Sequence, residues 1–216
     1  MKTLIVNAHV ISPDVDLKNA SIAIVNGKIK SVTVGKADKK GFDTVVDVRG
    51  KYVVPGFIDV HLHGACGFDV CDATPEAIAK IAEAKLAEGC TSFLPTTLTV
   101  ANSTLKKAAK AVAAYRKDER FAKVLGIHLE GPFINVKCCG AQNPKFVRKP
   151  NIKEVLGIDA ISPVKLISYA PETKGGAEFA AACIKKGIVP SCGHPRRGNT
   201  VRSGNICRNR RSSGAA

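Results

Sequence analysis

The chain has 216 residues, of which 45% are hydrophobic and 24% charged, as in a globular protein large enough to bury a core. Its apolar runs fall well short of the roughly 20 residues that a membrane-spanning helix needs, and residues 1–12 lack the apolar block of a secretory signal. The formal net charge of +15 would suit nucleic acid, but no aromatic side chains interleave the arginines of residues 195–216. We therefore expect a cytoplasmic protein with neither a membrane segment nor a nucleic-acid partner.

Residues 1–52 form the first predicted region, in which apolar and polar residues alternate as they do in half-buried strands. The alternating runs are LIVNAHVIS, SIAIVNGKIKSVTV and TVVDVRGKYVV. They are separated by the turn pairs Pro13-Asp14, Asn26-Gly27 and Arg49-Gly50. Asn-Gly between alternating runs is a strong hairpin signal. The region is predicted to be a small antiparallel β unit.

Residues 53–194 change to a rhythm of strand, helix, strand. Strands are expected at 53–64, 91–98, 122–132, 164–172 and 188–194, and helices at 74–89, 102–117, 152–157 and 175–187. Apolar strands that alternate with helices are typical of parallel βαβ units, and apolar strands with polar carboxyl ends fit a (β/α) barrel. A closed barrel has about eight strands. The fold class is therefore α/β, a partial TIM-type barrel with about five strands.

Residues 195–216 differ abruptly in composition. They contain six arginines and no lysine, whereas lysine dominates the basic residues before them, and apolar periodicity stops. We interpret this region as an irregular tail, disordered or read in a shifted frame.

The eight cysteines contain no CxxC pair and match no common structural zinc spacing. Several lie within apolar runs, where a free thiol behaves as a small hydrophobic group. We expect buried thiols and not a disulfide framework.

Two histidines end the first predicted barrel strand, in VVPGFIDVHLHG. Side chains two residues apart in a strand share a face, so His61 and His63 are expected to point the same way at the carboxyl end, where barrel active sites lie. Two neutral imidazoles there can hold a divalent ion. Asp59 lies one layer deeper on the same face and is expected to support them.

Two further candidate ligands end later strands. Glu130 sits inside the apolar run GIHLEGPF, where a carboxylate needs a charged partner, and His194 ends the fifth strand. His128 shares the face of Glu130 one layer deeper and is expected to be a supporting or core residue. Ligands at three strand ends are what a hydrolytic metal centre on an α/β barrel requires.

Metal-assisted amide hydrolysis also needs a group that takes a proton from water and returns it to the leaving nitrogen. Glu172 is the nearest candidate at the remaining strand ends, and its position does not favour the role. The sequence identifies no catalytic acid or base.

At these residues the chain resembles a known family. The segments PGFIDVHLHG, GIHLEGPFIN, GAQNPKFVRKP, APE and GH, at their separations, are similar to N-acetylglucosamine-6-phosphate deacetylase, within the amidohydrolase superfamily. The resemblance runs from Met1 to His194. It implies a metal-dependent deacetylation of N-acetylglucosamine 6-phosphate to glucosamine 6-phosphate and acetate, in amino-sugar catabolism.

The resemblance also assigns roles to residues. Glu130 and His194 would be metal ligands, and His61 with His63 matches members that can hold a second ion, so one or two divalent ions (Zn, Fe, Mn or similar) are implied. Ala141 and Gln142 match the segment that contacts the phosphorylated amino sugar. The small β unit becomes part of a β-sandwich, and family members are usually homodimers.

The resemblance ends at His194. The next strand's metal histidine, the catalytic aspartate of the last strand and the phosphate-binding residues have no counterpart in residues 195–216, so the chain is interpreted as C-terminally truncated and its activity as impaired or absent. Two other readings stay open. One is a different amidohydrolase acting on a cyclic or acyl amide; the other is a non-catalytic remnant that binds the phosphosugar.

Overall fold

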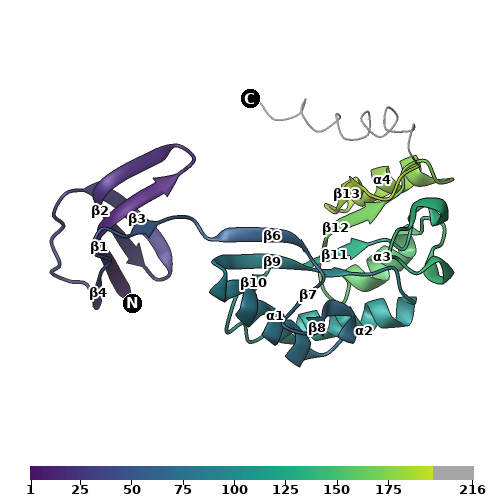
Figure 1. The fold of residues 1–216 in the computed structure, drawn as a ribbon, viewed down its shortest axis with the longest axis horizontal. Coiled ribbons are helices and arrows are strands. Elements are labelled where there is room, and N and C mark those ends of the chain that lie inside the picture. The colour runs from purple at the N-terminus through teal and green to yellow at the C-terminus, as the bar shows by residue number, and fades with distance from the viewer. Residues whose placement is uncertain (197–216) are drawn as a thin grey trace. The chain divides into compact units, whose positions relative to one another are not determined.

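The computed structural model describes residues 1–196 of the chain. These residues belong to two compact units, Met1–Gly56 and a second unit that begins at Phe57 (Figure 1). Each unit has its own hydrophobic core, as independently packed units do. The first unit ends at Gly56, past the boundary expected after residue 52.

The first unit is one five-stranded sheet. Its strands are β1 (Lys2–Ser12), β2 (Val15–Val25), β3 (Lys28–Val34), β4 (Thr44–Asp47) and β5 (Tyr52–Val53). Strands β1, β2 and β3 pair antiparallel, as the alternation predicted. The prediction of an entirely antiparallel unit is wrong for β4 and β5, which pair with β1 in parallel. Alternation identifies strands, but the path of the connecting loop decides their direction.

The hairpin between β2 and β3 forms at the predicted turn. Asn26 and Gly27 both have positive φ, 51° and 74°, which is the backbone of a type I′ turn. Glycine adopts this conformation without steric cost, and asparagine tolerates it better than most residues. The small core beneath the sheet consists of Ala8, Val10, Ala20 and Ile22.

The second unit contains a parallel sheet and four helices. Its longer strands are β6 (Phe57–Leu62), β9 (Cys90–Thr97), β10 (Lys123–Val124), β11 (Ile127–Glu130), β12 (Val164–Tyr169) and β13 (Val189–Cys192). Its helices are α1 (Pro75–Ala87), α2 (Asn102–Tyr115), α3 (Ile152–Asp159) and α4 (Gly176–Lys185). Short elements complete it: β7 (Gly64–Ala65), β8 (Phe68–Asp69) and the 3-10 turns η1 (Val70–Asp72), η2 (Val136–Cys138) and η3 (Pro144–Phe146).

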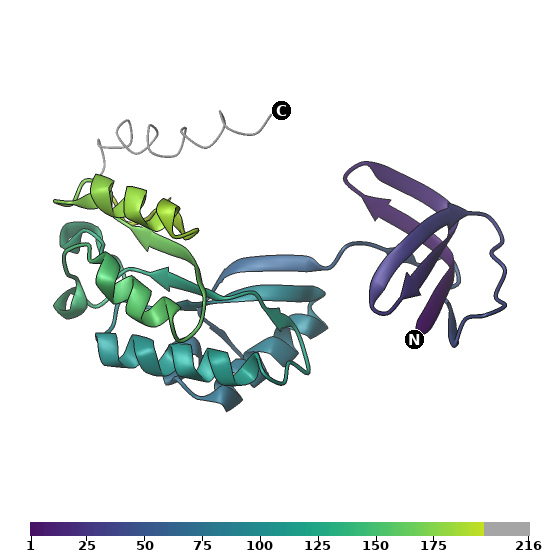
Figure 2. The same cartoon turned by 180° about the vertical axis from the view of Figure 1, so that it is seen from behind.

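The parallel strands follow the chain order across the sheet. Strand β6 pairs with one edge of β9, β10 and β11 pair with the other, and β12 and β13 follow. Helices α1 and α2 lie along one face of this curled sheet in both views (Figures 1 and 2). We call β6, β9, β11, β12 and β13 the half-barrel. It confirms the predicted partial barrel of five strands.

Local sequence explains where the helices start. The Thr74 side chain accepts a hydrogen bond from the backbone of Ala77, and Pro75 occupies the first turn of α1, where its missing N–H costs nothing. The predicted helices 102–117 and 152–157 appear as α2 and α3, and the loop before α3 contains the short turns η2 and η3.

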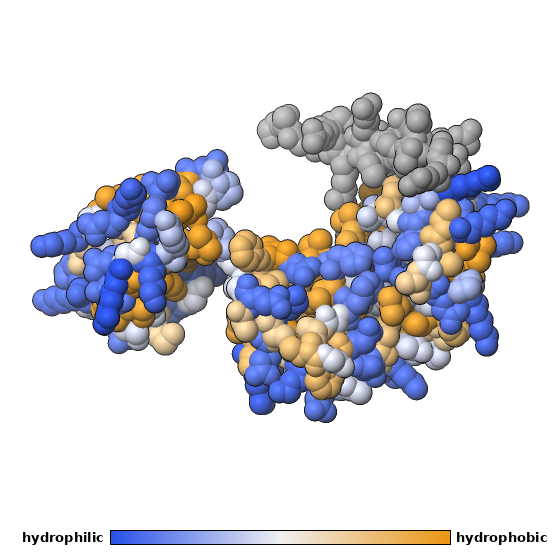
Figure 3. Space-filling model, viewed as in Figure 1, coloured by the Kyte–Doolittle hydropathy of each residue, from blue (hydrophilic) through white to orange (hydrophobic). Residues whose placement is uncertain are grey.

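Apolar side chains fill the space between the half-barrel and its helices. The largest fully buried ones include Phe93, Phe133, Leu129, Ile167 and Tyr169, from the middle strands and the segments that follow them. The first strand is different, because Phe57 is 66% and Ile58 61% exposed. Apolar surface is visible over β6 in the space-filling view (Figure 3).

Seven of the eight cysteines lie in the described region and none of these is in a disulfide. Only Cys90 and Cys183 are buried, so the expectation of buried thiols is wrong for the other five. None of the helices formed by residues 1–196 has the length and apolar character needed to cross a membrane. The predicted irregular tail lies outside the described residues, apart from its first two positions.

Candidate metal centre

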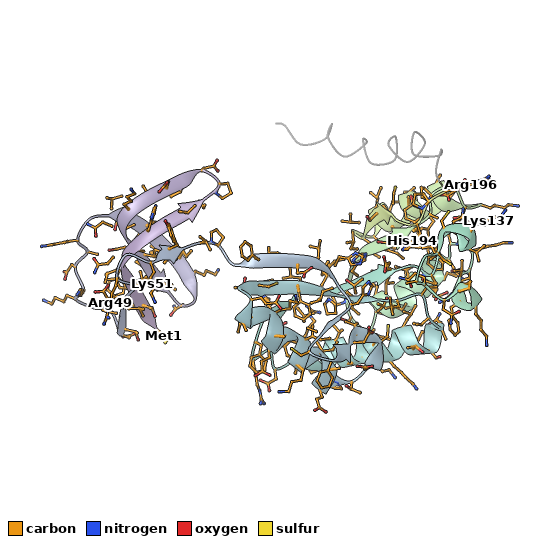
Figure 4. The ribbon with its side chains drawn as sticks, in the orientation of Figure 1. Met1, Arg49, Lys51, Lys137, His194 and Arg196 are labelled. Atoms are coloured by element: carbon orange, nitrogen blue, oxygen red, sulfur yellow. The ribbon has the colours of Figure 1, made fainter. Side chains whose placement is uncertain are left out.

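The four predicted ligands come from the carboxyl ends of three parallel strands. His61 lies in β6 and His63 directly follows it, Glu130 is the last residue of β11, and His194 follows β13 by two residues. The carboxyl ends of parallel strands meet at one rim of a sheet. Figure 4 shows His194 at this rim, on the same side as the loop that carries Lys137.

The side chains of this group converge on the carboxylate of Glu130. Its Oε2 lies 3.1 Å from His63 Nε2, and its Oε1 lies 3.7 Å from His61 Nε2 and 3.3 Å from His194 Nε2. The two imidazole Nε2 atoms of His61 and His63 are 3.1 Å apart. Ligand atoms of His61, His63 and Glu130 all lie within 4.8 Å of one another. The structure therefore brings all four residues together.

Strand β6 reaches this position through an irregularity. Its pairing with β9 shifts register between Asp59 and Leu62, and side chains replace the lost ladder partners. The backbone N–H of His61 donates to Asp59 Oδ1 at 3.0 Å, and that of Leu62 donates to Thr96 Oγ1 at 2.9 Å. Bulges beside active sites commonly re-aim a side chain in this way. Asp59 thus supports the rim through the backbone of His61.

Backbone carbonyls fix the orientation of two imidazoles. Nδ1 of His63 lies 3.1 Å from the Thr96 oxygen, and Nδ1 of His194 lies 3.0 Å from the Cys138 oxygen. A carbonyl only accepts hydrogen bonds, so each Nδ1 carries a proton and each ring turns its Nε2 toward Glu130. A histidine held in this way binds a metal through Nε2 once that nitrogen carries no proton.

The carboxylate of Glu130 is charged. Burial opposes its ionisation, but hydrogen bonds from His63 and His194 outweigh that effect and hold the pKa of Glu130 at about 2. The same hydrogen bond to Glu130 raises the pKa of His63, against the opposing effect of burial. With 12% of its side chain exposed, Glu130 is a buried anion whose natural partner is a cation.

The turn after Glu130 requires glycine. Gly131 has φ of 76°, and a Cβ built there would lie 2.2 Å from Thr99 Oγ1. That hydroxyl donates to the Glu130 carbonyl at 3.3 Å. The close approach holds the end of β11 against the loop after β9.

Gln142 contacts the same carboxylate. Its Nε2 donates to Glu130 Oε2 at 2.6 Å, and its Oε1 accepts a hydrogen bond from the backbone N–H of Thr99 at 2.6 Å. The side chain is buried, whereas its neighbour Ala141 is exposed. Contact of Ala141 and Gln142 with substrate stays a prediction.

His128 lies beneath the rim and is 2% exposed. Its Nδ1 donates to the Val60 carbonyl at 2.9 Å, so its Nε2 accepts a hydrogen bond from Ser168 Oγ at 2.8 Å. Burial lowers the pKa of His128 to about 4, so the ring is neutral near pH 7. The residue ties β6 and β12 to β11, in keeping with a supporting role.

The donor set fits a divalent ion. Imidazole nitrogens and a carboxylate oxygen are common ligands of Zn, Fe and Mn, and the three rings turn their Nε2 atoms toward Glu130. The Nε2 atoms of His61 and His63 lie 3.1 Å apart beside the Glu130 carboxylate, so one ion would be within reach of both. His61, His63 and Glu130 form the group that would hold it, and His194 contacts the same carboxylate.

No catalytic acid or base emerges among residues 1–196. The Oε1 atom of Glu172 accepts hydrogen bonds from Asn135 Nδ2 at 2.8 Å and from the Arg196 backbone at 2.7 Å, which engages it in the loop. Sequence reasoning missed the supporting roles of Thr96 and Thr99. The polar run at the end of SFLPTTLT, at the carboxyl end of a strand, was the available signal.

The chain is similar in sequence to known proteins of one family. The profile of the Amidohydrolase family matches residues 52–186. An N-acetylglucosamine-6-phosphate deacetylase from Lysinibacillus sphaericus is 30% identical over 194 residues, covering 82% of this chain and 49% of the relative. An N-acetylgalactosamine-6-phosphate deacetylase from Escherichia coli O157:H7 is 32% identical over 154 residues, covering 70% and 41%.

A solved structure extends the comparison to the fold. The crystal structure of N-acetylglucosamine-6-phosphate deacetylase from Pasteurella multocida superposes with a TM-score of 0.84 at 26% identity, covering 95% of this chain and 54% of that one. The chain thus spans about half the length of the relatives that it matches.

Proposed function

Because the chain belongs to the amidohydrolase family, we propose that its rim is the metal centre of a deacetylase that acts on an N-acetylated amino sugar 6-phosphate. One observation carries the proposal: ligand atoms of His61, His63 and Glu130 lie within 4.8 Å of one another, and His194 contacts the same carboxylate at 3.3 Å. The substrate class follows the names of the relatives, whose acetylated sugars are glucosamine and galactosamine phosphates.

The described residues include candidates for binding the metal and the substrate. A bound divalent ion supplies Lewis-acid polarisation of the amide carbonyl and makes water more acidic. Glu130 stays ionised, and its two oxygens face different histidines, Oε2 toward His63 and Oε1 toward His194, an arrangement that suits one or two ions. Ala141, exposed beside this group, stays the candidate for sugar contact.

No residue among 1–196 is assigned to proton transfer, so the proposal rests on metal binding by the rim. A phosphorylated amino sugar is its proposed small-molecule partner. The cytoplasmic location and the homodimeric state remain predictions.

Metal binding is the first test. Protein stripped with a chelator is titrated calorimetrically with Zn²⁺ or Mn²⁺, beside the variant Glu130→Gln. We expect saturable binding of one or two ions that the variant loses. Binding that is the same in both proteins would show that the ions occupy other groups.

Activity is the second test. A chimera joining residues 1–194 to the remaining half of the Lysinibacillus sphaericus relative is assayed for acetate release from N-acetylglucosamine 6-phosphate, N-acetylgalactosamine 6-phosphate and a cyclic amide. Acetate release that is lost with Glu130→Gln supports the proposal. Hydrolysis of the cyclic amide alone would indicate a different amidohydrolase.

A further inference from the structure

The Glu130 carboxylate contacts three histidines, so its orientation matters more than that of any other side chain of the site. A carboxylate can rotate about its last bond, yet Oε1 must face His61 and His194 while Oε2 faces His63. The histidine contacts alone do not fix this rotation, because each ring can move with its own strand. A separate contact from outside the three ligand-bearing strand ends is therefore informative.

We propose that Gln142 is the positioning residue of this centre: its side-chain amide holds the Glu130 carboxylate in the rotation that presents Oε1 to the histidines at both ends of the half-barrel. The inference rests on the proposed metal site. In this role Gln142 does not contact the ion but orients the carboxylate that does.

The amide of Gln142 has only one possible orientation. The backbone N–H of Thr99 can only donate, so the amide oxygen faces Thr99 and the NH₂ group faces Glu130 Oε2. Both heavy-atom distances are 2.6 Å. A hydrogen bond from a neutral amide to an ionised carboxylate is stronger than one between two neutral groups. Since the side chain is 7% exposed, little water competes for either end.

The same loop also holds His194. The backbone N–H of Gln142 donates to the Cys139 carbonyl at 3.0 Å, and the neighbouring Cys138 carbonyl accepts the proton of His194 Nδ1 at 3.0 Å. One turn of chain therefore fixes the carboxylate of β11 through a side chain and the imidazole beyond β13 through a carbonyl. Both contacts are made by the loop and not by a neighbouring strand, so the loop sets the spacing of Glu130 and His194.

Removal of a hydrogen-bonding partner of a metal ligand commonly weakens metal binding by about 10- to 100-fold. Gln142→Met keeps the side-chain length and loses both hydrogen bonds. Gln142→Asn keeps an amide that is one methylene too short to reach Thr99 and Glu130 together. Val136→Thr is the matched control, because Val136 is 52% exposed in the same loop and the exchange preserves shape.

The four proteins are titrated with Co²⁺, with affinity read by calorimetry and ligand geometry by the visible absorption spectrum. Metal-free melting temperatures establish that each variant folds. We expect wild type and Val136→Thr to share one affinity and one spectrum, and both Gln142 variants to bind about 10- to 100-fold more weakly with an altered spectrum.

The outcomes separate the two proposals. If wild type itself fails to bind Co²⁺, the metal centre is wrong and the role of Gln142 falls with it. If wild type binds and either Gln142 variant keeps its affinity and spectrum, Gln142 does not position Glu130, although the metal centre stands.

Discussion

The middle and outer strands of the half-barrel differ in what covers them. On β11 and β12 the side chains of Leu129 and Ile167 are fully buried, whereas on β6 Phe57 and Ile58 are more than half exposed. The proposed metal centre draws on both kinds of strand, since Glu130 ends a middle strand while the histidines come from β6 and the end of β13. A well-packed centre thus supplies the anion, and less covered edges supply the imidazoles.

This difference shows what polar contacts do at the rim. Each outer strand is tied to the middle by hydrogen bonds: His128 to the Val60 carbonyl, the Leu62 N–H to Thr96, and the Gly193 N–H to the Tyr169 carbonyl at 2.9 Å. Apolar packing gives the edges little support, so these contacts hold the histidines in register. The predictions below test this division, beginning with the largest effect.

Glu130→Gln should remove metal binding almost completely. The neutral amide lacks the charge that offsets a cation, and one of its two heavy atoms becomes a donor facing histidine nitrogens. We expect affinity for Zn²⁺ to fall by more than the roughly 100-fold seen for supporting residues, measured by calorimetry. Glu83→Gln, an exposed change on α1, is the control and should leave affinity unchanged. Equal losses in both would point to general surface binding.

His128→Leu should loosen β6 from the middle strands. The variant leaves the Val60 carbonyl and Ser168 Oγ without their partner, and each buried unsatisfied group costs about 1–3 kcal/mol. We expect the free energy of unfolding to fall by about 2–4 kcal/mol in urea titrations. Hydrogen exchange should rise most in β6. Faster exchange confined to β12, with β6 unaffected, would contradict the role as a tie between strands.

Acid should destabilise the second unit through the same residue. Burial lowers the pKa of His128 to about 4, against about 6.5 in an unfolded chain. Below pH 6.5 His128 is therefore protonated in the unfolded state, whereas in the folded state it is protonated only near pH 4. Stability should fall by about 3 kcal/mol as pH drops through this window. Urea titrations at several pH values should show this loss in wild type and its absence in His128→Leu.

The titrations of Glu130 and His63 affect stability mostly outside that window. The pKa of Glu130 is lowered to about 2, so its stabilising effect is lost only as pH falls below about 4.5. The pKa of His63 is raised, so its contribution is complete below pH 6.5 and is lost as pH rises. A stability loss between pH 6.5 and 4 that persists in His128→Leu would therefore assign the effect to another group.

Much of this unit could be predicted from local sequence. Thr74 and Pro75 mark the start of α1, and alternation of apolar strands with amphipathic helices gives parallel strands whose carboxyl ends share a rim. From that rule alone His61, His63, Glu130 and His194 are expected together. The spacing of these four residues along the chain reflects the fold's geometry, which is why their convergence could be predicted from the sequence.

The features that could not be predicted depend on the paths of loops and on side chains of neighbouring strands. Gln142 meets Glu130 across a loop that contains η2 and η3, and no periodicity fixes the path of such a segment. The parallel pairing of β4 with β1 escaped prediction for the same reason, since the connection between β3 and β4 decides it. The bulge in β6 depends on side chains of β9 and β11 that replace ladder partners, which alternation cannot reveal.

The smallest expected effect is the sharpest test of the comparison between edge and centre. Ile58→Thr keeps the β-branched shape, and because Ile58 is 61% exposed, the free energy of unfolding should change by less than about 0.5 kcal/mol. The same exchange at Ile167, fully buried on β12, should cost about 2–4 kcal/mol through lost packing and a buried hydroxyl. Both variants are compared by urea titration.

Self-association supplies the second readout for this pair. An exposed apolar edge strand with unpaired backbone groups favours contact between chains, so Ile58→Thr should reduce concentration-dependent association in sedimentation velocity, while a folded Ile167→Thr should not. If Ile58→Thr instead destabilises the protein as strongly as Ile167→Thr, then β6 is covered in solution. The side chains of β6 would then be packed as closely as those of β11 and β12, and the outer and middle strands would not differ in burial.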